Sequence, residues 1–319
     1  MSTLNRPYLW DEEAAFKRLE AAIWPDGPVC PHCGNKDRIY VLEGVRSKPS
    51  KKNPEGIVRH GLKKCGACRK QFTARMGTVF ESSHVALHKW MQAIHLMVSS
   101  KKGVSAHQLH RTLEITYRSA WFLAHRIREA MRTGELAPMG GPGAIVEIDE
   151  TFIGKKEGET KRAGGYAHKQ AVLSLVERGG EVRSFQIEKA NTANIKPIVD
   201  ANLSKESMLM TDESRYYGKL GKGFKHHFTV DHGSGEYVRG GVHVNTLESY
   251  FSVFKRGMKG VYQHCSERHL HRYLAEFDFR YNNRVAKGVN DSARADLALL
   301  GVVGKRLTYR DSFGQEECS

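Results

Sequence analysis

The segment GAIVEID, residues 143–149, reads as a buried strand that ends in an acid. Isoleucine and valine favour extended backbone, and the glycine in front of them suits a turn. Asp149 therefore falls at the carboxyl end of this strand. A second short apolar run, SMLMTD (residues 207–212), ends in the same way at Asp212. We expect two strands that each carry an aspartate to their carboxyl ends.

Three further apolar segments between residues 171 and 232 read as strands, and two longer segments read as helices. Two of these strands would form a hairpin that turns across Gly179–Gly180. The order of the elements predicts a mixed five-stranded sheet with helices on its faces. The strands are AVLSLVER (171–178), VRSFQIEK (182–189) and HHFTVDH (226–232), and the helices are TANIKPIVDANL (192–203) and NTLESYFSVFKRGM (245–258).

Three acids of this region can converge at one edge of the sheet. Asp149, Asp212 and Glu248 would offer the oxygen ligands that Mg²⁺ or Mn²⁺ prefers. A pair of such ions suits phosphoryl transfer, because one polarises the attacking hydroxyl and the other stabilises the leaving oxygen. Lys255 follows Glu248 by about two helical turns and so shares its face. The cations expected to bind phosphates here are Lys255, Arg256 and Lys259.

Each of these acids also has an ordinary structural explanation. Asn245 and Glu248 fit the first and last positions of a capping box at the start of a helix. Aspartates at strand ends often begin turns. Three such acids in a chain whose N-terminal part also binds metal favour a catalytic role. Glu248 could cap the helix and bind a metal ion at the same time.

Two C-x-x-C pairs predict a structural zinc site near the start of the chain. CPHC (30–33) and CGAC (65–68) each place two thiolates on one tight turn. Two such turns supply the four sulfurs of a tetrahedral Zn²⁺ site. A redox role would need a neighbouring βαβ pattern, and the sequence shows none. We expect one structural zinc ion, with Cys30, Cys33, Cys65 and Cys68 as its ligands.

Residues 84–133 have helical periodicity and are similar to a helix-turn-helix. Ser105 followed by Gln108 is typical of a capping box, and Thr116 can cap the next helix. That helix would read DNA and carries Arg118 and Arg126. The alternative is an ordinary helical pair with surface arginines. The surrounding positive charge favours DNA binding.

Arginines also recur at about four-residue steps in ERHLHRYLAEFDFRYNNR, residues 267–284. Arg268, Arg272, Arg280 and Arg284 would form a drifting stripe on one helix face and could contact the DNA backbone. The alternative is a solvated helix face with internal ion pairs.

The charge composition of the chain indicates what class of molecule it binds. The formal net charge is +15, and residues 1–140 hold 23 Lys and Arg against 12 Asp and Glu. Such an excess suggests a polyanion, most simply nucleic acid. We see no apolar leader and no run of about 18 apolar residues, so we expect no membrane partner. The paired cysteines indicate metal binding in a reducing compartment, which is the cytoplasm.

These motifs together resemble the DDE-superfamily insertion-sequence transposases, in the bacterial ISXO-like branch with an N-terminal zinc ribbon and an RNase H-like catalytic domain. The resemblance runs from about Cys30 to Arg284. The segments that carry it are CPHCG, KCGACRKQFTARMGTVFESS, LHKWMQAIHLMVSSKKGVSAHQL, VEIDETFIG, TDESRYY, HVNTLESYFSVFKRG and HLHRYLAEFDFRYNNR.

The resemblance implies a role for each of the acids. Asp149 would be the first catalytic acid and Asp212 the second. Glu248 would be the third, with 35 residues between it and Asp212. Lys255 matches the basic residue expected two turns later.

Two positions leave alternatives open. The third position in this branch is sometimes attributed to an asparagine, which here would be Asn245. An amide oxygen can bind Mg²⁺ but adds no charge, so we prefer Glu248. Asp231 is a weaker competitor for the second position, because it follows a different strand.

The implied function is transposition of a bacterial insertion sequence. The protein would bind double-stranded DNA at terminal inverted repeats and at a target, as a homodimer or a larger assembly. With two Mg²⁺ or Mn²⁺ ions it would cut at the end of the element and join the 3′-hydroxyl to target DNA. A nuclease that does not join strands and a domesticated zinc-containing DNA-binding regulator are the alternatives.

We expect four parts in the chain. They are a zinc ribbon with an N-terminal helix (1–80), a helix-turn-helix-like DNA-binding region (81–135), the RNase H-like catalytic domain (136–290) and a C-terminal tail (291–319).

Overall fold

The structure is a computed structural model and describes residues 3–51, 53–134, 136–160, 165–236 and 238–308. The chain divides into two compact units. The first unit contains residues 1–100, 104–131 and 289–319, and the second contains 101–103 and 132–288. None of the described helices has the length and apolar character needed to cross a membrane.

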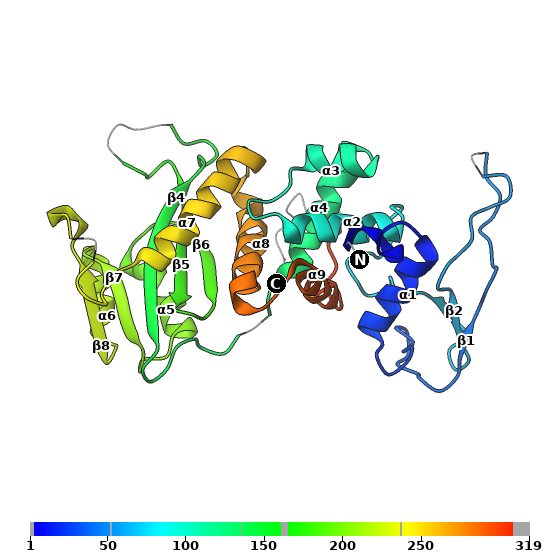
Figure 1. The fold of residues 1–319 in the computed structure, drawn as a ribbon, viewed down its shortest axis with the longest axis horizontal. Coiled ribbons are helices and arrows are strands. Elements are labelled where there is room, and N and C mark those ends of the chain that lie inside the picture. Colours follow the sequence, from blue (N-terminus) through cyan, green and yellow to red (C-terminus); the bar gives the residue numbers. More distant parts are fainter. Residues whose placement is uncertain (1–2, 52, 135, 161–164, 237, 309–319) are drawn as a thin grey trace. The chain divides into compact units, whose positions relative to one another are not determined.

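The N-terminal part of the first unit contains a helix and a three-stranded sheet (Figure 1). Helix α1 (Glu12–Ile23) begins after Asp11, whose carboxylate accepts a hydrogen bond from the backbone N–H of Ala14 at 2.7 Å. Strands β1 (Ile39–Val41), β2 (Lys63–Cys65) and β3 (Gln71–Phe72) pair antiparallel in the order β1-β2-β3. This is the predicted zinc ribbon, with its four cysteines in one cluster.

The rest of the first unit is helical. Both predicted caps are confirmed, because Ser105 accepts from Gln108 N–H at 3.1 Å and Thr116 accepts from Ser119 N–H at 3.2 Å. The helices are α2 (Leu87–Ser99), α3 (Ala106–Leu113), α4 (Tyr117–Met131) and α9 (Asp291–Leu300).

Helix α9 lies in the segment that the sequence assigned to a C-terminal tail. It packs against α1, α2 and α4. Its buried Arg294 donates a hydrogen bond to the carbonyl of Val98 in α2 at 2.8 Å. Residues 291–300 are therefore a packed part of the first unit.

The second unit is built on a five-stranded mixed sheet in the order β6-β5-β4-β7-β8. The central strand β4 pairs antiparallel with β5 and parallel with β7, and β7 pairs parallel with β8. The predicted mixed five-stranded sheet of an RNase H-like fold is confirmed. The strands are β4 (Ile145–Ile153), β5 (Gln170–Glu177), β6 (Val182–Ile187), β7 (Met208–Asp212) and β8 (His226–Val230).

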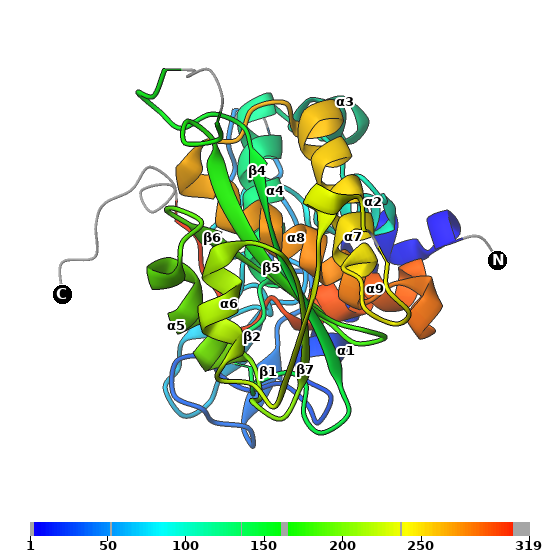
Figure 2. The same cartoon turned by 90° about the vertical axis from the view of Figure 1, so that its left-hand side faces the viewer.

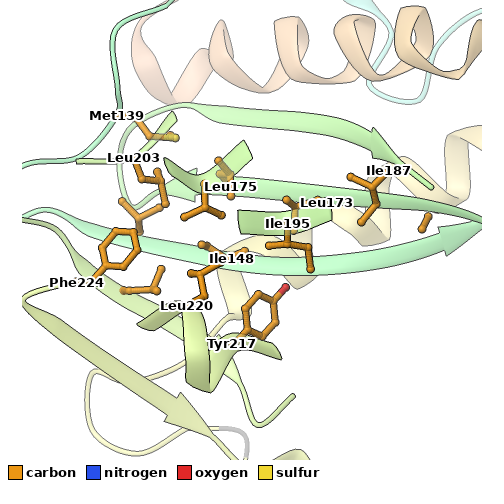
Figure 3. Packing of buried hydrophobic residues seen from close by; sticks show 14 residues of the cluster. Met139, Ile148, Leu173, Leu175, Ile187, Ile195, Leu203, Tyr217, Leu220 and Phe224 are labelled. Atoms are coloured by element: carbon orange, nitrogen blue, oxygen red, sulfur yellow. The ribbon is translucent and has the colours of Figure 1, made fainter. Parts of the chain in front are cut away.

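Helices cover both faces of this sheet (Figure 2). One face packs against α5 (Thr192–Asn202) and α6 (Arg215–Gly221), with Ile148 of β4 in that core (Figure 3). The other face packs against α7 (Asn245–Gly257) and α8 (Leu270–Asn282). A single π-helical turn, Met258–Tyr262, continues α7.

Alternation along β4 decides which helix each acid faces, because successive side chains of a strand point to opposite faces. Ile148 lies on the α5–α6 face. Glu147 bonds to residues of α7 on the other face. Asp149 shares the α7 face with Glu147, whereas Glu150 points toward α6.

Candidate active site and zinc site

The four cysteines of the ribbon form a cluster with the spacing of a zinc site. The Sγ atoms of Cys30 and Cys68 lie 3.7 Å apart, and those of Cys33 and Cys65 lie 3.6 Å apart. Four sulfurs held tetrahedrally at Zn–S distances of about 2.3 Å would lie about 3.8 Å from one another. The backbone N–H of Cys68 lowers the pKa of Cys65 to about 6, which favours the thiolate that binds metal. The cysteines therefore fit a closed zinc site.

A second cluster contains carboxylates and lies where the acids of β4 and β7 come together. One oxygen of each of Asp149, Glu150 and Asp212 lies within 4.8 Å of the others. Ser214 donates its N–H and its hydroxyl to Asp212, both at 3.0 Å. The convergence follows from the parallel pairing of β4 with β7, which brings Asp149 beside Asp212. Asp212 ends β7 as expected, whereas β4 continues to Ile153, so the prediction that its strand ends at Asp149 is wrong.

Negative charge is concentrated around Asp149. Burial, followed by the charges of Glu150 and Asp212 and a smaller contribution from Glu248, raises the pKa of Asp149 well above its usual range. Carboxylates this close repel one another, and a divalent cation among them would offset that repulsion. The donor set is made of oxygen atoms, so the residues fit the hard cations Mg²⁺ and Mn²⁺.

Glu150 is a member of this cluster that sequence reasoning missed. Its carboxylate accepts hydrogen bonds from the hydroxyls of Tyr216 and Tyr217, the latter at 2.6 Å. Burial raises the pKa of Glu150 to about 7, although the bond from Tyr217 opposes that shift. The signals in the sequence were the adjacent acids in EIDE and the paired tyrosines in SRYY, on two segments that only the fold brings together.

Helix α7 lies on the same face of the sheet as Asp149. Glu248 is exposed on its first turn. Burial lowers the pKa of the half-buried Lys255, and the negative charge of Asp149 opposes this shift. Glu248 and Lys255 thus both interact electrostatically with Asp149, as expected for residues two turns apart on one face.

The predicted capping box at the start of α7 is wrong. Asn245 is the first residue of the helix, and the residue before it, Val244, has no capping side chain. The exposed Asn245 donates its backbone N–H to Nδ1 of His243 at 3.4 Å. Another residue therefore satisfies the N–H groups at this helix end.

Glu147 of β4 takes the capping position from outside the helix. Its fully buried carboxylate accepts from Leu247 N–H at 3.1 Å and from the Thr246 hydroxyl at 2.8 Å. Arg178 donates its Nε–H to the same carboxylate at 2.6 Å. Arg178 also donates to the carbonyls of Gly241 and His243, at 2.7 and 2.8 Å. The Glu147–Arg178 pair thereby ties the start of α7 to the strand that carries Asp149.

Three of the arginines expected to contact DNA are structural instead. Arg126 is 5% exposed and donates to the carbonyls of Val79, Glu81 and Leu307.

Arg272 and Arg280 are each 7% exposed. Arg280 pairs with the buried Glu276, which also accepts from the Tyr262 hydroxyl at 2.6 Å. The arginine stripe of α8 is thus not a solvated surface. The sequence-predicted cations that stay exposed are Arg118, Arg256, Lys259 and Arg268.

Asp231, the weaker competitor for the second catalytic position, has a local role. Asp231 follows β8, and its carboxylate accepts from Ser234 N–H at 3.1 Å at the start of a short 3-10 helix. The described residues that form the carboxylate cluster do not include it.

Comparisons with known proteins agree with this architecture. Residues 140–282 match the ISXO2-like transposase domain, and residues 10–71 match the transposase zinc-ribbon domain. The second unit is therefore similar to the ISXO2-like transposase domain, and the ribbon is similar to the zinc ribbon of transposases.

One curated relative is an uncharacterized protein in transposable element ISH50 of Halobacterium salinarum. It is 29% identical over 292 residues, which is 84% of this chain and 90% of the relative. A crystal structure of a pre-cleavage Mos1 transpososome covers 66% of this chain and 74% of its own, at 10% identity and a TM-score of 0.27. A TM-score this low supports no comparison of the two folds.

Proposed function

We propose that this protein is a transposase, which cuts DNA at the ends of its own insertion sequence and joins the resulting 3′-hydroxyl to target DNA. Asp149, Asp212 and Glu248 would hold the divalent metal ions on which both steps depend. The observation that supports this most is the convergence of Asp149 and Asp212 at one sheet edge, faced by α7. Both steps are in-line displacements at phosphorus, so one site can serve both.

When bound, two Mg²⁺ or Mn²⁺ ions would activate the attacking hydroxyl and stabilise the leaving oxygen. Asp149 and Asp212 would supply carboxylate oxygens from rigid strands. Glu150, held by its two tyrosine donors, would keep further negative charge at this edge. Lys255 would contact a phosphate oxygen of the DNA from α7.

Glu248 remains our preferred third ligand, with Asn245 as the alternative. The electrostatic coupling of Glu248 to Asp149 supports this choice. Glu248 also adds a charge, which Asn245 does not, and a divalent cation gains more from a carboxylate than from an amide. Asn245 stands one helical turn earlier and on an adjacent part of the same helix face.

We assign DNA binding to the zinc ribbon (1–80) and the helical region (81–135), and catalysis to residues 136–290. The ribbon would carry one structural Zn²⁺ ion and bind the terminal inverted repeats. Basic side chains would contact the DNA backbone, and affinity would fall steeply with salt. We expect a homodimer or larger assembly on DNA, in the cytoplasm and at the nucleoid of a bacterium. The cations are Arg118, Lys255, Arg256, Lys259 and Arg268.

A strand-transfer assay tests this proposal. Labelled DNA with the ends of the element is incubated with a target plasmid, in Mg²⁺ or in EDTA. We expect metal-dependent cutting and joining that Asp149→Asn and Asp212→Asn abolish. Glu188→Gln, a change at an exposed acid that lies outside the cluster, is the matched control.

The assay also separates the alternatives. Cutting without a joined product would indicate a nuclease. Sequence-specific binding of the correct end DNA, with no cutting in any metal, would indicate a DNA-binding regulator. Either result would overturn the proposed reaction.

A further inference from the structure

One face of the three-stranded sheet in the zinc ribbon is open to solvent. Cys65 and Phe72 point to the other face and are buried. The pairing register places Tyr40 opposite Lys64, and Lys64 opposite Gln71. Residues directly opposite one another point to the same face of a sheet. Tyr40, Lys64 and Gln71 therefore form one row across β1, β2 and β3, which we call the ribbon row.

The size and the chemistry of the ribbon row suit a groove of DNA. All three side chains are exposed, and Tyr40 is 56% exposed. Neighbouring strands lie about 4.8 Å apart, so the row is about 10 Å long from Tyr40 to Gln71. The major groove of B-DNA is about 12 Å wide, and some DNA-binding proteins place β-structure in it. A phenol ring, an ammonium group and an amide can all contact base edges there.

Both ends of the ribbon row are held in place by neighbouring residues. Gly66, in the second cysteine turn, donates its N–H to the carbonyl of Arg38 at 2.7 Å. A Cβ atom on Gly66 would lie 3.0 Å from Cε2 of Tyr40, so a side chain there would crowd this ring. At the other end, Arg59 donates to Oε1 of Gln71 at 3.3 Å. Side chains oriented in advance lose less entropy when a partner binds.

The charge around the ribbon row favours a polyanion. Residues 36–70 hold 11 Lys and Arg against 3 Asp and Glu. The connection from β1 to β2 extends beyond the sheet as a paired arm, with a bridge between Arg46 and Val58 (Figure 1). Lys48 and Lys51 are exposed on this arm. Lysines of this kind suit the phosphates of DNA, whereas the polar groups of the ribbon row suit the bases.

The predicted recognition helix, α4, is much less accessible than the ribbon row. Every residue of α4 from Ala120 to Met131 is buried or partly buried. Arg126 is bonded to three carbonyls of the first unit. The exposed part of α4 is its first turn, which carries Arg118. The ribbon row therefore offers more groups for base contacts than α4 does.

We propose that the ribbon row, and not α4, recognises the base sequence at the ends of the element, from the major groove. Gln71 bonds to N6 and N7 of an adenine, Lys64 donates to the acceptors of a guanine, and Tyr40 contacts a thymine methyl group. The lysines of the arm contact the flanking phosphates. This inference rests on the proposed function for its partner, the terminal repeat, but it needs no chemical step.

Binding to two duplexes tests the proposal in the full-length, zinc-loaded protein. One fluorescein-labelled duplex carries the terminal repeat and the other has the same bases in shuffled order. Anisotropy is measured without Mg²⁺, so that no DNA is cut. We expect the unmodified protein to prefer the repeat, and Gln71→Ala and Lys64→Ala each to reduce this preference by about 5- to 150-fold. Lys51→Ala weakens binding to both duplexes alike, because a phosphate contact carries no sequence information.

A modified base tests which groove is contacted. 7-Deazaadenine lacks the N7 acceptor of the major groove and leaves the minor-groove edge of the base unchanged. We expect a repeat that contains this base in place of adenine to bind the unmodified protein about 5-fold more weakly than the ordinary repeat. Gln71→Ala should bind the two repeats equally. Equal binding of both repeats by the unmodified protein would overturn the proposed contact.

Two further variants are controls. Lys189→Ala changes a side chain of the second unit that is 71% exposed, and it should leave both affinities unaltered. Arg118→Ala, in the first turn of α4, should weaken binding to both duplexes alike and keep the preference. An unchanged zinc content shows that each variant retains the folded ribbon.

The outcomes separate this inference from the proposed function. A preference that survives both Gln71→Ala and Lys64→Ala, or one that Arg118→Ala abolishes, overturns the inference. Equal binding of the two duplexes by the unmodified protein also overturns it. If the protein with such a result still cuts and joins DNA, the proposed function stands and only the inference is removed. A preference that depends on Gln71 in a protein that never cuts DNA does the reverse.

Discussion

Replacing Glu147 by glutamine tests how α7 is held in place. Glu147 is fully buried and accepts from Arg178, Thr246 and Leu247. Glutamine has nearly the same volume, so the change removes a charge without opening a cavity. One of its two terminal atoms is a donor, which then faces donors of Arg178 or α7. Arg178 loses its ion-pair partner in a buried setting.

The expected cost follows from these contacts. Removing one partner of a buried ion pair costs about 3–5 kcal/mol. Arg178 keeps 19% of its side chain exposed, so water partly solvates it and the lower end of that range applies. We therefore expect about 3 kcal/mol of lost unfolding free energy. For a unit of this size each kcal/mol lowers the melting temperature by about 2–4 °C, so the unit would melt about 6–12 °C earlier.

Two assays measure the effect of Glu147→Gln. Thermal unfolding without divalent metal measures the stability, with Glu188→Gln as a control, because the Glu188 side chain is 74% exposed. The metal concentration for half-maximal DNA cutting then measures the site, and we expect it to rise because Glu248 moves with α7. A melting temperature within 2 °C of the unmodified protein, together with an unchanged metal requirement, would refute the role given to Glu147.

Three further predictions concern zinc, pH and the arginines. Cys65→Ser should reduce bound zinc, measured by elemental analysis, from about one ion per chain to none; unchanged zinc content would contradict the ligand set. Burial raises the pKa of Asp278 from 3.8 to about 6, so the folded state binds the proton more tightly. The unfolding free energy should therefore fall by about 3 kcal/mol in total as pH rises from below about 4 to above about 6. Denaturant titrations should show a fall that is smaller by this amount in Asp278→Asn, and an equal fall in both proteins would count against it. Arg126→Ala should destabilise the first unit by about 2–4 kcal/mol, because three carbonyls lose their donor. Arg118→Ala should instead leave the melting temperature unchanged and reduce the slope of log affinity against log salt concentration by about one. The opposite pattern would reverse the two roles.

The parts of this molecule that the sequence predicts well are those with local causes. A C-x-x-C turn specifies the positions of its own two sulfurs, so the zinc cluster could be predicted from two short motifs. The strands that carry Asp149 and Asp212 each begin with a short apolar run, although β4 continues past Asp149 to Ile153. Their parallel pairing then brings the acids together.

The start of α7 shows what local patterns miss. Asn245 and Glu248 have the spacing of a capping box, yet Glu147 caps the helix from about a hundred residues away. Helix α2 begins in a similar way, since Glu12 of α1 accepts from the N–H groups of Leu87 and His88. A carboxylate from another element can satisfy a helix end as well as a local cap can, and only the fold reveals it.

The predictions for Arg126 of α4 and for Arg272 and Arg280 of α8 were wrong for a related reason. A periodic arginine pattern looks the same whether the helix face meets water or the interior of the protein. Arg126 can be buried because backbone carbonyls of distant segments accept hydrogen bonds from its guanidinium. Arg280 is buried because Glu276, one turn earlier, neutralises it. The carbonyl partners of Arg126 have no signature in the sequence around it. Glu276 is visible one turn before Arg280, but the sequence does not show whether that pair meets water or the interior.

Metal-specificity rescue at the carboxylate cluster tests the central claim most directly. A cysteine thiolate binds Mn²⁺ better than Mg²⁺, because it is a softer ligand than a carboxylate. The variants Asp149→Cys, Asp212→Cys and Glu248→Cys would be compared in the strand-cutting assay with each metal, and Glu188→Cys would be the control. We expect each of the three to lose activity in Mg²⁺ and to regain part of it in Mn²⁺, whereas the control is active in both. Full activity of Asp149→Cys or Asp212→Cys in Mg²⁺ would contradict the metal-dependent site.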